Sequence, residues 1–269
     1  MDANESALPM TRQVRGTTRR TRSLPGGVEA LPAASDSQRA RAIAASGPDG
    51  DFEPRERSEV LSAAFNIAIA LAMFIIASPI MLLTALLVRL SSRGPVFYTQ
   101  TRVGIDRRWN RTRALHERRR EDLGGTPFTI YKFRSMCVDA EANGQAVWAT
   151  ENDARVTAVG KFIRKTRLDE LPQLFNVIRG DMNIVGPRPE RPSIFVRLRE
   201  QITEYPLRQR VKPGITGMAQ VYHSYDRSVD DVRRKVHFDL EYMRRQSLVE
   251  DIRIMCLTVP VMLFRIGGW

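Results

Sequence analysis

The sequence predicts a membrane-associated α/β protein, mostly helical with short strands, in which a single membrane helix hairpin precedes a compact soluble domain. The first observation is a run of 29 residues without a charged side chain, residues 60–88, which exceeds the roughly 20 residues that cross a bilayer. The second is the rest of the chain, where helix-like stretches alternate with turns and two short strand-like segments. The third is a formal net charge of +12, which suits phosphate-rich partners such as nucleic acid, anionic lipid or a nucleotide.

The N-terminal region and the cysteines indicate the compartment. Residues 1–57 are rich in Ala, Ser, Pro, Gly and Arg and show no sustained apolar period, so we expect a disordered tail. Its opening lacks the apolar stretch of a secretory signal. The two cysteines, Cys137 and Cys256, form neither a metal-type cluster nor a disulfide framework. A reducing, cytosol-facing compartment follows.

Residues 58–93 form the expected membrane element, which we interpret as re-entrant and broken at Ser78 and Pro79. Proline removes a backbone donor and kinks a helix, and the neighbouring serine hydroxyl can satisfy a carbonyl that the proline frees. Arginines flank both ends of the apolar run: Arg55 and Arg57 before it, Arg89 and Arg93 after it. The positive-inside bias therefore places both ends on the cytosolic side. A kinked span and the core helix of a soluble protein are the alternatives.

Residues 94–247 should form the soluble domain, which begins with two strands. The segments 94–104 and 127–136 alternate as strands do, and the second places Lys132 and Arg134 on one face. The segment between them, residues 105–125, carries seven arginines and four acids. Such a run is typical of a solvated helix or loop, or of a patch that touches lipid phosphates.

Helical spacing follows further along the chain. It predicts helices around 172–179, near 193–205 and at 229–245. The last segment, 248–269, is apolar but interrupted by Arg253, Pro260 and Arg265. We expect an interfacial helix there, with Trp269 at head-group level, and burial against the soluble domain is the alternative.

The stretch TRLDELPQL places two acids, Asp169 and Glu170, side by side in this basic chain. Pro172 suits the first position of a helix, so the acids should precede the positive end of that helix, where both carboxylates and phosphates are stabilised. That placement, with Arg167 beside it, should keep Asp169 ionised. The alternative is capping, with Thr166 and Asp169 at a helix start.

Basic residues surround the acid pair in the sequence: Arg164, Lys165 and Arg167. This arrangement suits a site in which one carboxylate attacks or holds a metal while cations neutralise phosphates.

Two further motifs are candidates for phosphate binding. In GPRP, Arg188 stands between Pro187 and Pro189, so a five-donor guanidinium sits on stiff backbone. In KPGITG, Pro213 and Gly214 fit the centre of a type II turn whose amides, near Lys212, could cradle an anion. A plain rigid turn is the alternative for each motif.

The order of these motifs resembles the bacterial sugar transferases, the monotopic polyprenyl-phosphate phosphoglycosyltransferases. The resemblance covers residues 60–269 and rests on Ser-Pro in an apolar hairpin, YKFRSM, the ND-A-RVT stretch at 152–157, RKTRLDELPQLFNVIRGDMNIVGPRP and KPGITGMAQV. It implies a re-entrant helix at the bacterial inner (cytoplasmic) membrane and a catalytic domain in the cytosol. It also implies transfer of a phosphosugar from a UDP-sugar to undecaprenyl phosphate with Mg2+, which gives UMP and initiates exopolysaccharide or glycan biosynthesis.

The resemblance also implies roles for residues of this chain. Asp169 matches the nucleophile that forms a covalent phosphosugar intermediate, and it is also the candidate magnesium ligand; Glu170 matches its partner. The basic positions that match the diphosphate and nucleotide site are Lys132, Arg134, Arg164 and Arg188. Two departures are the long insertion at 105–125 and Met218, which stands where the family commonly has an aromatic residue.

Two rival functions stay open at this point. A membrane-tethered basic protein that binds nucleic acid or anionic lipid would explain the charge, but it leaves LDELP, GPRP and KPGITG without a purpose. The basic insertion has Trp109 as its single aromatic residue, so we expect no nucleic acid partner. The other rival is a Mg2+ phosphotransferase or hydrolase without a covalent intermediate. The particular UDP-sugar, and whether the chain forms a homodimer, are not decided by the sequence.

Overall fold

The computed structural model describes residues 52–108, 123–138, 140, 153–223 and 228–264. All of them belong to one compact unit, Ala44–Trp269. The predictions made for residues 1–51, for Trp109 and most of the arginine-rich insertion, and for Trp269 lie outside the described residues. The described end of the tail, residues 52–57, has no helix or strand but is packed: the Arg55 N–H donates to the Met243 carbonyl at 2.9 Å.

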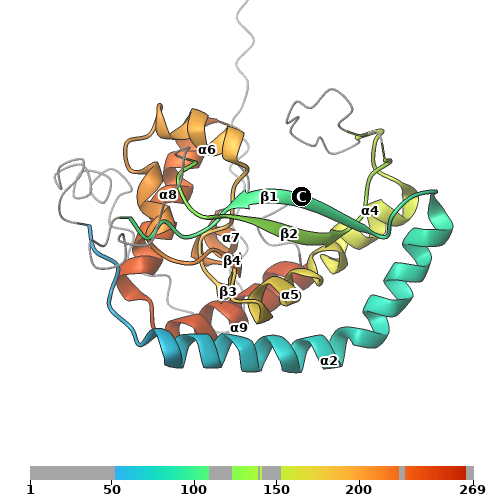
Figure 1. Ribbon diagram of the computed structural model, residues 1–269, viewed down its shortest axis with the longest axis horizontal. Coiled ribbons are helices and arrows are strands. Elements are labelled where there is room, and N and C mark those ends of the chain that lie inside the picture. Colours follow the sequence, from blue (N-terminus) through green and yellow to red (C-terminus); the bar gives the residue numbers. More distant parts are fainter. Residues whose placement is uncertain (1–51, 109–122, 139, 141–152, 224–227, 265–269) are drawn as a thin grey trace, which may run out of the picture. The chain divides into compact units, whose positions relative to one another are not determined.

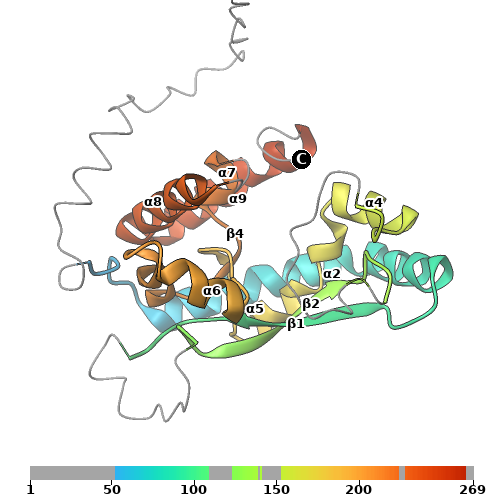
Figure 2. The same ribbon diagram turned by 90° about the horizontal axis from the view of Figure 1, so that it is seen from above.

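The described chain is mostly helical with short strands, as predicted (Figure 1). In chain order the elements are α2 (Glu59–Ser91), β1 (Phe97–Val103), β2 (Pro127–Phe133), α4 (Ala158–Lys165), η1 (Leu168–Glu170), α5 (Gln173–Ile178), β3 (Asn183–Val185), α6 (Pro192–Arg199), η2 (Tyr205–Arg210), β4 (Gly214–Thr216), α7 (Met218–Tyr222), α8 (Val229–Arg245) and α9 (Leu248–Phe264). Figures 1 and 2 place α4 at one end of the β1–β2 ribbon and α6 and α8 at the other.

Helix α2 is one continuous element with Pro79 inside it. Ser58 caps its N-terminus with a side chain that accepts from the Leu61 N–H, and the ribbon of α2 changes direction in its C-terminal part (Figure 1). The Ser78 hydroxyl donates to the Ile75 carbonyl at 2.8 Å, which is the carbonyl that Pro79 deprives of its helical donor. The expected serine compensation is confirmed, but the element is a bent helix and not two separate helices.

By length and composition, α2 is the one helix of the described chain that could cross a membrane, and 11% of its most apolar window is buried. The buried side chains of α2 are mainly small or polar: Ser62, Asn66, Ala70, Thr84 and Val88. Its large apolar side chains, such as Ile76 and Leu82, are exposed. Small residues allow close packing on the soluble part while the apolar side chains face outward, so α2 is suited to lie in lipid.

The strands form two small sheets. β1 and β2 are antiparallel, with Tyr98 opposite Lys132 and Arg102 opposite Phe128. Alternation puts Tyr98, Arg102 and Lys132 on the same face of this ribbon. β3 and β4 are parallel, and they bring the GPRP motif beside KPGITG.

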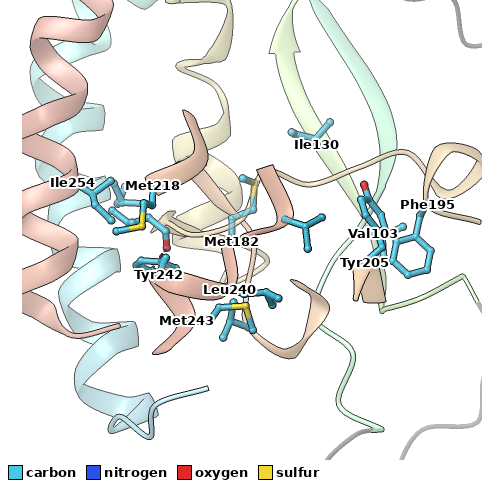
Figure 3. Packing of buried hydrophobic residues seen from close by; sticks show 14 of the residues in the cluster. Val103, Ile130, Met182, Phe195, Tyr205, Met218, Leu240, Tyr242, Met243 and Ile254 are labelled. Atoms are coloured by element: carbon cyan, nitrogen blue, oxygen red, sulfur yellow. Dashed lines mark hydrogen bonds between the residues drawn. The ribbon is translucent and has the colours of Figure 1, made fainter. Parts of the chain in front are cut away.

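The main core lies between these sheets and the C-terminal helices. Figure 3 shows Tyr242, Leu240 and Met243 from α8 and Ile254 from α9, with Phe195 and Tyr205 lying beside Val103 of β1. A second cluster joins Val88 of α2 to Phe133 and Ile163, with Leu168 packed against it.

Two expectations about individual elements were wrong. The helix expected near 193–205 is shorter, because α6 ends at Arg199 and a separate 3-10 helix, η2, begins at Tyr205 with Pro206 in its first turn. Proline cannot continue a helix that needs its N–H. The type II turn expected at Pro213 and Gly214 is absent, since Gly214 has no positive φ and begins strand β4.

Helix α9 combines the two interpretations of the C-terminal segment. Ile254 and Asp251 are buried against the rest of the unit, whereas Val249, Val259 and Met262 are exposed. A helix that is buried on one side and presents apolar side chains on the other fits a position at a membrane surface.

Candidate active site

The acid pair lies in the short 3-10 turn η1, between α4 and α5. Leu168 anchors this turn in the cluster formed by Val88, Phe133 and Ile163, so the C-terminal part of α2 supports the residue before Asp169. Arg167, the residue that begins the turn, has a φ of 58°, and it is the only non-glycine residue with positive φ in the described chain. Such a conformation is strained for a side-chain-bearing residue and is typical of functional turns.

The capping alternative is wrong. Thr166 ends α4, and its hydroxyl donates to the Phe162 carbonyl at 2.9 Å. The sequence predicted Pro172 as the first residue of the next helix. In the structure it is the residue just before α5, which begins at Gln173. The acids therefore precede α5, as the sequence predicted.

Glu170 is held by two cations. The Lys132 Nζ donates to Glu170 Oε1 at 3.0 Å. Arg188 donates to Oε1 at 2.6 Å and to Oε2 at 3.2 Å, the two-pronged geometry that favours arginine at carboxylates. Although burial alone would raise the pKa of Glu170, the charges of Arg188 and Lys132 outweigh it and hold this pKa well below its usual range. Glu170 is thus a fixed anion that orients both cations.

Asp169 has a different environment, although it is the adjacent residue and equally buried. Within the described chain no hydrogen bond or ion pair to its carboxylate is found. Burial and the neighbouring charge of Glu170 raise the pKa of Asp169 to about 6, against the opposing charges of Lys132, Arg167 and Arg188. Burial thus outweighs the nearby cations, but a pKa of about 6 still leaves most of the group ionised at neutral pH, the state that the sequence predicted.

The GPRP segment is fixed through its carbonyl groups, because two of its residues are prolines without an N–H. The four consecutive carbonyls of residues 187–190 all accept hydrogen bonds: Pro187 from the Gly214 N–H at 3.0 Å, Arg188 from Arg208 at 3.1 Å, Pro189 from Arg102 at 3.1 Å and Glu190 from the Val103 N–H at 2.9 Å. The side chain of Arg188 therefore extends from a backbone segment that is held in place by hydrogen bonds from β1, β4 and η2.

The KPGITG motif supports this segment by close approach. A Cβ on Gly214 would overlap the nitrogen of Gly186. The two backbones can therefore approach this closely only because residue 214 is a glycine. The Gly214 N–H is used by Pro187 and is not available to an anion. The motif therefore serves packing at this position, and the anion-binding role expected for its other amides stays a prediction.

Three of the predicted basic residues lie elsewhere. Lys212 points toward Gly180, at the end of α5, with its Nζ 3.7 Å from the position of a Cβ on that glycine. Arg134 donates to the Ser92 and Arg93 carbonyls at 2.8 and 2.7 Å, so it holds the end of α2. Arg164 lies in the last turn of α4, where its charge acts on Asp153. Lys132 and Arg188 donate hydrogen bonds to the acid pair, to Glu170. In the described chain, Lys212, Arg134 and Arg164 donate none to it.

The structure also adds charged residues that the sequence did not single out: Arg102, Glu190, Arg208, Lys235 and Asp239. Lys235 donates to Glu190 at 3.1 Å, and Arg208 donates to Asp239 at 2.6 Å. These partners are 45 and 31 positions apart in the chain, so no local pattern could have paired them. The candidate site therefore continues into a buried charge network that reaches α8.

The described residues contain no group of three or more His, Cys, Asp or Glu side chains that could hold a metal ion. Since Glu170 is occupied by Lys132 and Arg188, Asp169 is the carboxylate of this site with coordination capacity left. One carboxylate fits Mg2+ only when other oxygens complete its shell, and in phosphate-transfer sites the substrate's phosphates supply them.

The chain belongs to the bacterial sugar transferase family, whose model matches residues 57–265. This range contains the bent apolar helix, the buried acid pair and the proline-flanked arginine. Among its relatives is the UDP-N-acetylgalactosamine-undecaprenyl-phosphate N-acetylgalactosaminephosphotransferase of Aeromonas hydrophila, 44% identical over 191 residues, which are 71% of this chain and 41% of that protein.

Two further relatives carry a different sugar in their names. The UDP-glucose:undecaprenyl-phosphate glucose-1-phosphate transferase of Escherichia coli (strain K12) is 42% identical over 75% of this chain and 40% of its own length. The protein of the same description from Caulobacter vibrioides is 35% identical over 78% of this chain and 72% of its own length. The chain thus spans about two fifths of the first two relatives, 41% and 40%.

Proposed function

We propose that this chain transfers a sugar phosphate from a UDP-sugar to undecaprenyl phosphate, through a covalent intermediate on Asp169. The observation that carries the proposal is the unequal environment of two adjacent carboxylates. Glu170 is saturated by Lys132 and Arg188, while Asp169 has no hydrogen-bond partner in the described chain. A carboxylate that is buried, ionised and unpaired is the better nucleophile.

The first half of the reaction loads the enzyme. An oxygen of Asp169 attacks the phosphorus that bears the sugar, the bond from this phosphorus to the bridging oxygen breaks, and UMP leaves with that oxygen and the electron pair. In the second half an oxygen of undecaprenyl phosphate attacks the same phosphorus. The bond to Asp169 then breaks, the carboxylate is restored and undecaprenyl-diphosphate-sugar is released. Donor and acceptor therefore do not have to be bound together.

The cations allow an anion to attack an anion. Lys132 and Arg188 are oriented by Glu170, so their remaining N–H groups are fixed before the donor binds, which is the condition for electrostatic stabilisation of a transition state. We assign the diphosphate to these two residues and a magnesium ion to Asp169 together with the donor's phosphates. The ion would neutralise phosphate charge during displacement.

We also propose that α2 enters and leaves the membrane on the cytosolic face of the bacterial inner membrane. Both ends of α2 are tied to the same unit: Arg57, just before it, pairs with Asp251 of α9 at 2.9 Å, and Ser92, just after it, accepts from Arg134 at 2.8 Å. A helix along the bilayer normal would leave its ends about 30 Å apart on opposite sides of the hydrocarbon core. This arrangement supports a catalytic unit that lies at one membrane surface.

The test is a single-turnover experiment without acceptor. Purified protein with Mg2+ is given a panel of UDP-sugars, which includes the N-acetylgalactosamine and glucose donors because the relatives' names differ in this respect. We expect release of up to one UMP per protein and a gain in protein mass equal to one phosphosugar. Asp169→Asn should do neither, and Glu170→Gln should be slow but still form some adduct.

Four outcomes would contradict the proposal. Peptide mass spectrometry that places the adduct on another residue would remove Asp169 from its role. Release of UDP would show that the bond to the sugar breaks. Release of UMP only in the presence of undecaprenyl phosphate would favour direct transfer, and binding of nucleic acid or anionic lipid without turnover would favour a tethered binding protein.

A further inference from the structure

The loop that presents Arg188 is held by a side chain 20 positions away in the sequence. Arg208, in η2, donates from one terminal nitrogen to the main-chain carbonyl of Arg188 at 3.1 Å. We propose that Arg208 is a positioning residue for Arg188, and that its clamp by Asp239 of α8 sets the affinity of the site for the donor's diphosphate. This inference rests on the proposed function.

Arg208 is itself fixed on all sides. It is 1% exposed, its Nε donates to Asp239 at 2.6 Å, and its other terminal nitrogen donates to the Tyr205 hydroxyl at 2.9 Å. Its guanidinium also lies 5.0 Å from the centre of the Tyr205 ring. A planar guanidinium that is bound by both Asp239 and Tyr205 is held in one orientation. The hydrogen bond to the Arg188 carbonyl is therefore fixed in direction.

The hydrogen bond from Arg208 restrains the main chain of the site at the Arg188 carbonyl. Pro187 and Pro189 supply no N–H, so residue 188 is restrained through neighbouring carbonyls and its own. Its side chain must reach both oxygens of Glu170 at 2.6 and 3.2 Å. Rotation of the peptide that carries the Arg188 carbonyl would redirect the guanidinium, and the Arg208 hydrogen bond opposes that rotation.

Helix α8 carries the other half of the clamp. Lys235 and Asp239 are four positions apart and hence on one face of α8. Lys235 binds Glu190 at 3.1 Å and Asp239 binds Arg208 at 2.6 Å. One helix face thus supports the GPRP loop at two points.

The test is a double-substitution cycle with UDP affinity as its readout. Arg208→Lys keeps the positive charge beside Asp239 but cannot also reach the Arg188 carbonyl with fixed geometry. We expect the Kd for UDP and the KM for the UDP-sugar to rise about tenfold, the change that corresponds to one charged hydrogen bond, while kcat changes less. In the Arg188→Ala background the same Arg208→Lys change should leave the UDP Kd within about twofold, because the guanidinium that it positions is gone.

Two further variants separate positioning from stability. Arg57→Lys perturbs another arginine–aspartate pair, Arg57 with Asp251 at 2.9 Å, in which the arginine is partly exposed, and should lower Tm without raising KM. Asp239→Asn keeps an acceptor for Arg208 and replaces Arg208→Lys if that variant does not fold. We expect it to give a smaller rise in the UDP Kd when Arg188 is present, and a change within about twofold in the Arg188→Ala background.

An equal rise in Kd with and without Arg188 would show that Arg208 is merely structural, as would a fall in Tm with unchanged KM and Kd. UDP binding by the unsubstituted protein without any UMP release would overturn the proposed function, while the binding cycle would still decide the role of Arg208.

Discussion

Asp169 and Glu170 show how two adjacent, equally buried carboxylates acquire different roles. The turn η1 points Glu170 at Lys132 and Arg188 and leaves Asp169 without a hydrogen bond in the described chain. Their pKa values consequently shift in opposite directions. At the scale of the residue, the environment of each carboxylate depends on whether a cation contacts its oxygens.

Arg188 provides the sharpest prediction at this scale. Arg188→Lys keeps the charge but loses the two-pronged contact with Glu170. We therefore expect kcat/KM for the UDP-sugar to fall by an amount that corresponds to a loss of about 1–3 kcal/mol in transition-state stabilisation. Steady-state UMP release measures this value. A lysine variant with unchanged kinetics would show that the guanidinium fork has no part in donor use.

Elements of this protein are joined by buried polar contacts as much as by apolar packing. The Asn66 side-chain oxygen of α2 accepts the Ile184 N–H of β3 at 2.7 Å, one residue before Val185 and the GPRP motif. Helix α2 therefore completes the hydrogen bonding of the strand that leads into the site.

Removal of this acceptor should be costly. Asn66→Leu leaves the Ile184 N–H buried without a partner, so we expect a loss of about 1–3 kcal/mol in the free energy of unfolding, measured as a lower Tm in detergent. Thr84→Val is the matched control in the same helix, because the Thr84 hydroxyl donates to Ile80 of its own helix and its loss leaves no such orphan. Equal destabilisation by both variants would refute the prediction.

Glu190 links three elements and predicts a pH dependence. Burial would raise its pKa, but the charges of Lys235, Arg208 and Arg102 outweigh burial and lower the pKa of Glu190 to about 2, from a usual 4.5. A carboxylate with a lowered folded-state pKa stabilises the fold above its unfolded value and loses this contribution as the pH falls toward the folded value.

Glu190→Gln should therefore lower Tm at pH 7, and the difference from the unsubstituted protein should shrink as the pH falls from about 4.5 toward 2. Thermal unfolding at a series of pH values measures this difference. A difference that stays constant over that interval would show that the charge of Glu190 does not contribute.

The sequence predicted local elements well and distant contacts poorly. The helix expected at 229–245 is α8, Val229–Arg245, because its caps and apolar spacing are local signals. Lys132 and Glu170 were singled out by motif, and the structure joins them at 3.0 Å. The roles expected for Arg134, Arg164 and Lys212 stay predictions, since a basic side chain in a motif can equally bind a helix end. Arg208 and Asp239 gave no signal, because their partnership exists only in three dimensions.

At the scale of the whole molecule, the attachment of both ends of α2 to one unit predicts its topology. In a background with Cys137 and Cys256 replaced by serine, single cysteines at the exposed positions Glu56 and Lys161 report on the segment before α2 and on the domain after it. Both should resist a membrane-impermeant thiol reagent in intact cells and react after lysis. Labelling of the Glu56→Cys variant from outside would show that α2 spans the membrane.

The β1–β2 ribbon has a consequence for protein engineering. Its two strands are closed at the connection by the pairing of Val103 with Pro127, and the Gly104 N–H and Thr126 N–H continue the ladder with bonds of 2.9 Å each. Tyr98 and Lys132 lie toward the opposite end of the ribbon, and their alignment belongs to the same register as the pairing of Val103 with Pro127. An engineered variant that must keep Lys132 in register with Tyr98 should therefore leave the paired backbone of residues 97–105 and 126–133 unchanged, because a slip of one residue would turn Lys132 to the other face of the ribbon.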